Sequence, residues 1–297
     1  METDFSSFPP ISITAYSDYY DLPEPKVWGD YWFKENLTRE FLRIGYPVDH
    51  SVPGILLHLF GEPDKNISAD TYNILWIHSH PDWITPEILR KYRKIYCISE
   101  YFIQKITDMG FRSERLMMPT FMTPQKTKKR YDVIFVGNTK QNRIRKIIKD
   151  LGDPSCNVKI WGWGWKGLIP DDWYGGDYYE HAKLNELYAA SKIVLNDHHE
   201  DMRREGFINP RILDVLASGG FVISDSVTGM DEMLNNSVVT YNSPEDLRRL
   251  IEKYLDDDKG RELISKKGQE IALRYNFRSA CSEIIRHIRS ISDKLFP

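Results

Sequence analysis

The chain has 297 residues, of which 41% are hydrophobic and 28% are charged, and it carries a formal net charge of −3. This length favours two domains, and no stretch reaches the roughly 18 apolar residues that a membrane span needs. The start of the chain lacks the basic residues and apolar run of a secretory signal, and the 3 cysteines are too scattered for a disulfide framework or a CxxC metal site. We therefore expect a soluble, cytoplasmic protein without the global positive charge of a nucleic-acid binder.

The first half of the sequence predicts short buried strands separated by polar loops and helices. Residues 31–44 have the apolar spacing of a helix, which Gly45 would close as a C-cap. A second helix would open at Ser99, whose hydroxyl suits an N-cap, and end at Gly110. The strands predicted here are residues 11–16, 54–60, 73–78 and 94–98.

The second half alternates strands and helices more regularly. The predicted strands are residues 131–136, 157–161, 192–196 and 221–224. The predicted helices are residues 140–151, 184–190, 210–218, 244–255, 261–275 and 279–291. Alternation of this kind implies a parallel sheet that helices cover on both faces.

A basic, polar stretch at residues 124–130 separates the two halves. It has no apolar periodicity and precedes a strong strand, so we predict an interdomain linker with a boundary near residue 128. The predicted domains are residues 1–127 and 128–297, with the last helix as a candidate to pack back on the N-terminal domain.

The most distinctive segment runs from residue 193 to residue 225: a strand, a polar loop with two histidines, a helix start and a Gly-Gly exit into another strand. It contains the triplet Glu205-Gly206-Phe207, then Asp214, then Ala217-Ser218-Gly219 before the final strand. Here the chain resembles the GT-B glycosyltransferases, in particular the CgeB-like and family 4 retaining enzymes. The resemblance implies an α/β GT-B fold, with two Rossmann-like domains whose parallel sheets face each other across a cleft. One departure is that Glu205 and Asp214 are one position further apart than in the family 4 pattern.

By this resemblance, the C-terminal domain binds a nucleoside-diphosphate sugar as a co-substrate, and neither a cofactor nor a metal ion is expected. Helix N-termini attract phosphate, so Asn209 and Arg211, at the start of the predicted helix 210–218, suit a diphosphate. The Asp214 carboxylate would, by resemblance, accept hydrogen bonds from the ribose hydroxyls.

Further donor-binding candidates follow strand ends, where ligands collect in open α/β sheets. These candidates are Gly137, Asn138, Lys140, Arg143 and Asn196. Trp161 and Trp163, which have glycines beside them, would stack on the nucleobase.

Four residues are candidates for the chemistry. His198, in the loop after a predicted strand, would donate a hydrogen bond to the leaving diphosphate. Glu205 is the first acid of the family pattern. In the N-terminal domain, Asp30 would bind acceptor or sugar hydroxyls or cap a helix. His78 would contact the acceptor, because the His-x-His pair that it begins has no obvious third metal ligand.

We therefore predict a glycosyltransferase that moves a sugar from a nucleoside-diphosphate sugar to an acceptor hydroxyl. By resemblance, the reaction is metal-independent and retains the anomeric configuration, with the acceptor on the N-terminal domain. The acceptor is a glycan, a small molecule, a protein or modified DNA. The alternatives on the same fold are a phage-type DNA glycosyltransferase acting on hydroxylated bases, a sugar-nucleotide epimerase or phosphorylase, and a non-catalytic nucleotide-sugar-binding module.

Overall fold

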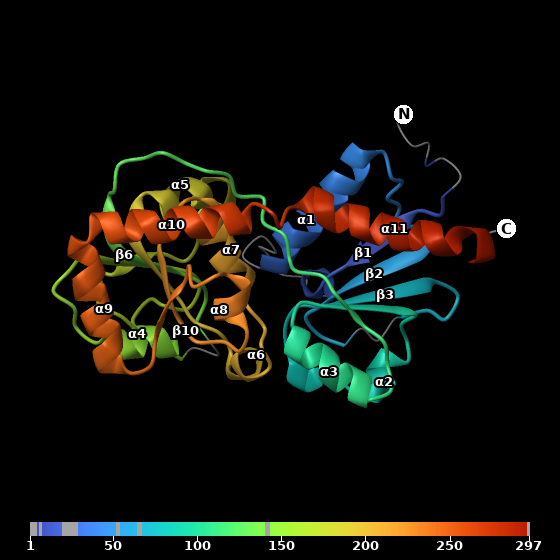
Figure 1. The fold of residues 1–297 in the computed structure, drawn as a ribbon, viewed down its shortest axis with the longest axis horizontal. Coiled ribbons are helices and arrows are strands. Elements are labelled where there is room, and N and C mark those ends of the chain that lie inside the picture. The colour runs from blue at the N-terminus through green and yellow to red at the C-terminus, as the bar shows by residue number, and fades with distance from the viewer. Residues whose placement is uncertain are drawn as a thin grey trace. The chain divides into compact units, whose positions relative to one another are not determined.

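The computed structural model describes residue 5 and residues 8–19, 29–51, 54–63, 67–139 and 143–295. The chain forms two compact units (Figure 1). Unit 1 comprises Met1–Pro119, Arg204–Phe207 and Tyr275–Pro297, and unit 2 comprises Thr120–Arg203 and Ile208–Arg274. The chain therefore enters unit 2 at Thr120, and the last helix belongs to unit 1.

Unit 1 is built on a parallel sheet that has five strands in the described residues, in the order β1-β2-β3-β4-β5. These strands are β1 (Ile11–Thr14), β2 (Ile55–Phe60), β3 (Tyr72–Ile77), β4 (Lys94–Cys97) and β5 (Glu114–Arg115). The α-helices are α1 (Gly29–Ile44), α2 (Pro86–Leu89), α3 (Glu100–Asp108) and α11 (Phe277–Leu295). In Figure 1, α1 and α11 lie together on one side of the sheet and α2 and α3 lie on the other. Because helices cover both faces, β2 and β3 are buried over almost their whole length and read as continuous apolar runs.

Unit 2 is built on a second parallel sheet, in the order β11-β10-β9-β6-β7-β8. Its strands are β6 (Tyr131–Val136), β7 (Val158–Trp161), β8 (Tyr174–Gly176), β9 (Ser191–Asn196), β10 (Val222–Asp225) and β11 (Val239–Tyr241). Its α-helices are α4 (Lys146–Leu151), α5 (Leu184–Ala189), α6 (Glu200–Arg204), α7 (Pro210–Ala217), α8 (Met230–Met233), α9 (Pro244–Asp256) and α10 (Asp258–Ala272). The core between sheet and helices holds the fully buried rings of Phe135 and Trp165.

The predicted α/β class and each of the predicted strands are confirmed. The strands that the sequence did not predict are β5, β8 and β11, which lie at sheet edges and are too short for an apolar run. The predicted helix 140–151 is wrong at its start, because α4 begins only at Lys146. Arg145 has an extended backbone, and the apolar positions that hold α4 against the sheet begin at Ile147.

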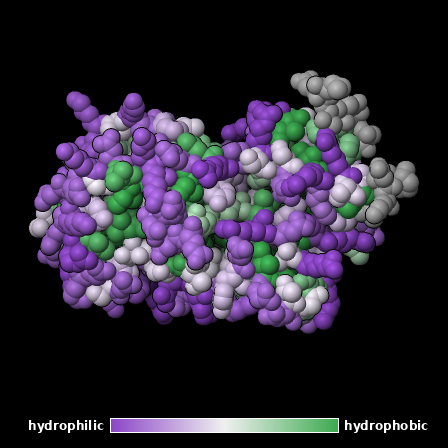
Figure 2. Space-filling model, viewed as in Figure 1, coloured by the Kyte–Doolittle hydropathy of each residue, from purple (hydrophilic) through white to green (hydrophobic). Residues whose placement is uncertain are grey.

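Polar side chains cover most of the face seen in Figure 2, and apolar ones form small separate patches. Within the described ranges, no helix is long and apolar enough to cross a membrane.

Gly162 lets the loop after β7 pack directly on the loop after β6. Its φ is 142°, a backbone conformation that L side chains rarely adopt. A Cβ at this position would lie 2.2 Å from the carbonyl oxygen of Gly137. That same oxygen accepts a hydrogen bond from the Trp165 indole at 2.7 Å, so separating the two loops would break this hydrogen bond. The position of Gly137 is therefore set by the glycine that faces it.

We expect Gly162→Ala to lower the free energy of unfolding by about 3 kcal/mol or more, because it adds a steric clash to backbone strain. Urea denaturation followed by circular dichroism measures this change. Gly167→Ala is the matched control, since Gly167 also has a positive φ but nothing lies within 4 Å of its missing Cβ. The control should cost about 1 to 2 kcal/mol, and equal losses in the two variants would contradict the packing argument.

Candidate functional site

The carboxyl ends of β6, β9 and β10 lie around the topological switch point of the unit 2 sheet. The chain continues from β6 to β7 on one side, whereas β9 and β10 follow on the other. The loops after β6 and β9 consequently diverge, and open α/β sheets bind ligands in the crevice that this creates. This edge of unit 2 is the candidate site.

One buried amide, that of Asn196 at the end of β9, joins several of these elements. Its Nδ2 donates a hydrogen bond to Ser224 Oγ in β10 at 2.9 Å. Its Oδ1 accepts hydrogen bonds from Asn209 Nδ2 and from Arg211 Nη1, each at 2.9 Å. Asn196 therefore fixes the start of α7 and the direction of the Arg211 side chain relative to the sheet.

Arg211 is a partly buried cation without a carboxylate partner. Its guanidinium lies over the ring of Phe135, 5.5 Å from the centroid, and a Cβ on Gly137 would come within 2.8 Å of its Nη2. In the part of the chain that the structure describes, no carboxylate forms an ion pair with it. Burial lowers the pKa of Arg211, yet a guanidinium stays charged in proteins. The positive charge is thus available to an anion.

The start of α7 is also open to an anion. Asn209 occupies the N-cap position, but its side chain makes no capping hydrogen bond. It donates instead to Asn196 and to the carbonyl oxygen of Asp197, at 3.0 Å for the latter. Pro210 has no N–H, and the Ile212 N–H donates to the carbonyl oxygen of Asn209 at 3.2 Å. In this first turn, among the described residues, the backbone N–H of Arg211 therefore keeps its hydrogen-bonding capacity, as in phosphate sites at helix N-termini.

Arg145, which precedes α4, differs from Arg211 because a carboxylate, that of Asp197, pairs with it. Its Nη2 lies 2.5 Å from Asp197 Oδ1 and its Nε lies 3.2 Å from Oδ2, so the pair is bidentate. Both side chains are almost completely buried. Its Nη1 also donates to the carbonyl oxygen of Asn138, at 3.4 Å. Arg145 therefore holds the loop after β6 against the end of β9, with its charge already neutralised.

His198 is held by Asp225 at the end of β10. The Nδ1 atom of His198 lies 2.6 Å from Asp225 Oδ1, and the backbone N–H of His198 donates to Oδ2 at 3.1 Å. The imidazole has no exposed surface, and its Nε2 has no hydrogen-bond partner among the described residues. A direct contact with a ligand would require this ring to become accessible.

Asp214 lies one helical turn after Arg211 on α7. Its Oδ1 accepts a hydrogen bond from Thr120 Oγ1 at 2.6 Å. Burial raises the pKa of Asp214 to about 6, although the hydrogen bond from Thr120 and the charge of Arg211 lower it. The carboxylate is consequently ionised at neutral pH and ready to accept hydrogen bonds.

Residues 140–285 match the model of a family described as glycosyl transferase-like. The fold is similar to that of Anabaena Alr3699/HepE in complex with UDP and glucose, with 10% identity, a TM-score of 0.65, and coverage of 95% of this chain and 100% of that one. It is also similar to the β-glucosyltransferase of phage T4, with 14% identity, a TM-score of 0.64, and coverage of 97% and 100%. No curated protein matches the sequence.

This protein has a GT-B fold and a glycosyl transferase-like domain. The predictions of a GT-B fold and of a glycosyltransferase are thereby confirmed. The matched region contains Arg145, Asn196, Asn209, Arg211 and Asp214, so the side chains that meet at the switch point all belong to the glycosyl transferase-like domain. The CgeB-like type stays a prediction.

The two tryptophans predicted to stack on a nucleobase have different surroundings. Trp161 is buried between the rings of Tyr131 and Tyr179, at centroid distances of 5.6 and 5.1 Å. Trp163 is 60% exposed, and its backbone N–H donates to Asn138 Oδ1 at 2.9 Å. In this structure Trp161 is a packing residue, and Trp163 offers an open ring in the glycosyl transferase-like domain.

Asp30 and His78, two of the candidates in unit 1, are constrained by burial. Asp30 Oδ2 accepts a hydrogen bond from the Ser17 backbone N–H at 2.8 Å, and burial raises its pKa. The carboxylate therefore ties the segment after β1 to the start of α1. Burial lowers the pKa of His78 to about 3, with a further contribution from the neighbouring His80. His78 is consequently neutral at physiological pH, and its Nε2 has no partner within the described ranges.

Glu205 belongs to unit 1 and is neutralised there by two cations. Lys105 Nζ lies 2.6 Å from its Oε2, and Arg204 Nε lies 2.8 Å from its Oε1. Burial opposes ionisation, but these contacts hold the pKa of Glu205 below its ordinary value. Its carbonyl oxygen also accepts a hydrogen bond from Ser99 Oγ at 2.6 Å. The catalytic role predicted for Glu205 stays a prediction, and its contacts here anchor the segment.

Two of the predicted phosphate contacts stay predictions. Lys140 lies outside the described residues, and Arg143 is exposed. Arg145 is the arginine of this stretch that reaches Asp197, and the sequence analysis did not select it. No local signal marked it, because Ile144, Ile147, Ile148 and Leu151 have a helical spacing that runs across Arg145.

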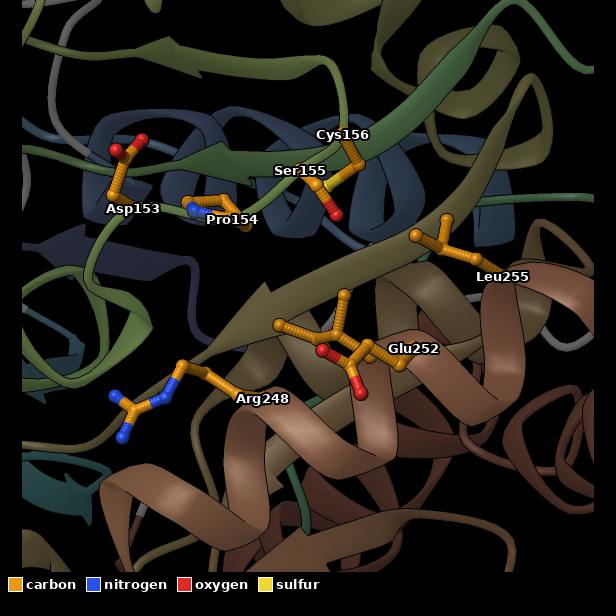
Figure 3. A pocket seen from close by; sticks show the side chains of 8 residues that line it. Asp153, Pro154, Ser155, Cys156, Arg248, Glu252 and Leu255 are labelled. Carbon is orange, nitrogen blue, oxygen red and sulfur yellow. The ribbon is translucent and has the colours of Figure 1, made fainter.

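Unit 2 also has a shallow cavity of about 140 Å³ near Cys156 and Arg248 (Figure 3). Cys156 precedes the amino end of β7, so this cavity lies at the sheet edge opposite the switch point. Within the described chain, no group of three His, Cys, Asp or Glu side chains is arranged to hold a metal ion.

Replacing Asp214 by asparagine should make folding stability less sensitive to pH. The folded carboxyl has a pKa of about 6 against an ordinary 3.8, so the folded state binds the proton more tightly. The wild-type protein therefore loses stability as the pH rises from about 4 to 6. The asparagine side chain would keep an acceptor for Thr120 but cannot ionise.

We expect Asp214→Asn to be more stable than wild type at pH 8 by up to about 3 kcal/mol, and the difference to vanish near pH 4. Urea denaturation at pH 4, 6 and 8 measures it. If the difference in stability between the two proteins does not change with pH, the folded state does not raise the pKa of Asp214.

Proposed function

We propose that this protein transfers a glycosyl group from a nucleoside-diphosphate sugar to an acceptor hydroxyl, and that unit 2 binds the donor. The observation that carries the proposal is the guanidinium of Arg211, which is held by Asn196 and has no carboxylate partner among the described residues. It lies at the uncapped start of α7 and against Gly137. A planar, charged donor beside the backbone N–H of Arg211 at a helix start is suited to a diphosphate.

Neutralising the leaving diphosphate is the main demand of this reaction. The bond between the sugar C1 and the distal phosphate oxygen breaks, and its electron pair stays on that oxygen. The acceptor oxygen forms the new bond to C1 and loses its proton to the diphosphate or to solvent. Arg211 and the start of α7 supply fixed positive charge at the developing anion, which is why we propose a metal-independent reaction.

The nucleoside contacts that we propose are Asp214 for the ribose and Trp163 for the base. A partly buried carboxylate accepts hydrogen bonds from two neighbouring hydroxyls, and an exposed indole offers a flat apolar face. The similar fold of Anabaena Alr3699/HepE, whose structures contain UDP-glucose or UDP, supports uridine as the first base to test here.

Acceptor binding belongs, in this proposal, to unit 1, with Asp30 and the neutral His78 as contacts. Retention of the anomeric configuration is proposed from the resemblance of residues 193–225 to family 4 enzymes. The anomeric configuration of the product, determined by NMR, distinguishes retention from inversion.

Replacing Arg211 by methionine tests the donor site. We expect UDP affinity, measured by calorimetry, to fall roughly 10-fold to 100-fold, because hydrogen bonds to charged groups are worth about 1.5 to 3 kcal/mol. The melting temperature of the unliganded variant should stay the same or rise, since the substitution removes a desolvated, unpaired charge. UDP, GDP, ADP and TDP are compared first, so that the best-bound nucleotide is used.

Arg249→Met is the matched control, because Arg249 is an exposed arginine of unit 2 that pairs with Asp246 on α9. It should leave nucleotide affinity unchanged. Unaltered affinity in Arg211→Met, or a large fall of its melting temperature in the unliganded protein, would contradict the proposal.

Modified DNA is the second candidate acceptor. The phage T4 β-glucosyltransferase is described as a DNA-modifying enzyme, and its fold corresponds to almost all of this chain. Binding of duplex DNA should then weaken steeply between 50 and 200 mM salt, as expected when roughly 6 or more phosphates are contacted. If the protein does not bind duplex DNA in this salt-dependent way, small molecules and glycans remain as the candidate acceptors.

A further inference from the structure

Thr120 connects the entry of the chain into unit 2 with the carboxylate of α7. It is buried and is the first residue of unit 2. Its Oγ1 accepts a hydrogen bond from the Met122 backbone N–H at 3.1 Å and donates its only proton to Asp214 Oδ1 at 2.6 Å. Because the carboxylate can only accept, the direction of this hydrogen bond is fixed.

Asp214 is therefore held at both its side chain and its backbone. Its carbonyl oxygen accepts hydrogen bonds from the backbone N–H and the Oγ of Ser218, at 3.1 and 2.7 Å. Among the described residues, Thr120 is the one hydrogen-bond donor to its carboxylate, and it contacts Oδ1. Oδ2 and the second lone pair of Oδ1 are left for a ligand.

We propose that Thr120 is a positioning residue for ribose recognition, which orients the Asp214 carboxylate and keeps it ionised so that it accepts hydrogen bonds from the 2′- and 3′-hydroxyls. The inference rests on the proposed function, because it takes Asp214 as the ribose contact. Thr120 acts through Asp214 and does not itself touch the ligand.

The electrostatic balance around Asp214 explains why one hydroxyl matters. Burial drives the carboxyl towards its neutral form, whereas Thr120 and the guanidinium of Arg211 favour the ionised form. The phenol of Tyr188 on α5 also faces this pair and hydrogen-bonds to Arg211. Loss of the Thr120 hydroxyl raises the pKa of Asp214 further. A neutral carboxyl has fewer acceptor sites, so it discriminates less well in favour of a ribose.

The test compares a nucleotide with its 2′-deoxy form. Calorimetry gives the affinities of UDP and 2′-deoxy-UDP, or of the GDP or ADP pair if wild type binds that base better. We expect wild type to prefer the ribonucleotide by roughly 10-fold to 100-fold. Thr120→Val, which keeps the shape without the proton, should reduce this ratio to below about 3-fold at pH 6.5 and recover part of it at pH 8.5.

Thr120→Ser restores a hydroxyl and should keep the wild-type ratio. Thr123→Val is the matched control, because Thr123 is an exposed threonine of the same segment. If Thr120→Val weakens both nucleotides equally, its role is purely structural and the inference is overturned. A wild-type protein that binds nucleotides without preferring ribose also overturns it but leaves the proposed function standing. A wild-type protein that binds no nucleotide refutes the proposed function itself.

Discussion

The amide of Asn196 is the contact on which the candidate site depends, because it joins the ends of β9 and β10 to the start of α7. Its Nδ2 bonds to β10, and its Oδ1 bonds to Asn209 and Arg211 at the start of α7. A parallel sheet brings the carboxyl ends of strands to one edge but does not say which side chains will face a ligand. Asn196 makes that choice by drawing the guanidinium of Arg211 towards the switch point.

The two arginines at this edge differ in the partner that the chain provides. Arg145 is paired with Asp197 in a buried, bidentate contact that fixes the loop after β6. Arg211 has a neutral amide and an aromatic ring as neighbours, and no described carboxylate forms an ion pair with it. An unpaired, desolvated charge lowers the stability of the fold. Proteins keep such a group where a bound ligand supplies its counter-charge. From this difference we propose that Arg145 is a scaffold residue and that Arg211 binds the ligand.

Local patterns account for what the sequence predicted well. Buried strands such as β2 and β9 are continuous apolar runs, so they can be recognised without knowledge of their neighbours. Arg211 and Asp214 were selected as candidates because a helix start and a family motif coincide at residues 209–214, and their roles stay predictions. The edge strand β8, with the sequence YGG, carries no such pattern and forms only because β7 offers it a partner.

Long-range contacts account for what the sequence missed. The partner of Asp214 is Thr120, which lies far away in the chain, and nothing local marks it as important. The sequence predicts Glu205 only as a candidate for the chemistry. Its neutralisation by Lys105 can be seen only in the folded unit. The same holds for Trp161, whose burial depends on Tyr131 and Tyr179.

The central claim is that the donor diphosphate binds at Arg211 and the start of α7. A crystal structure of the protein soaked with UDP-glucose tests it most directly. The account predicts diphosphate oxygens within hydrogen-bonding distance of the Arg211 guanidinium and of the Arg211 backbone N–H at the start of α7, with the Arg145–Asp197 pair intact. A diphosphate bound elsewhere, with the Arg211 guanidinium still on Asn196 and Phe135 and touching no phosphate oxygen, would contradict the account.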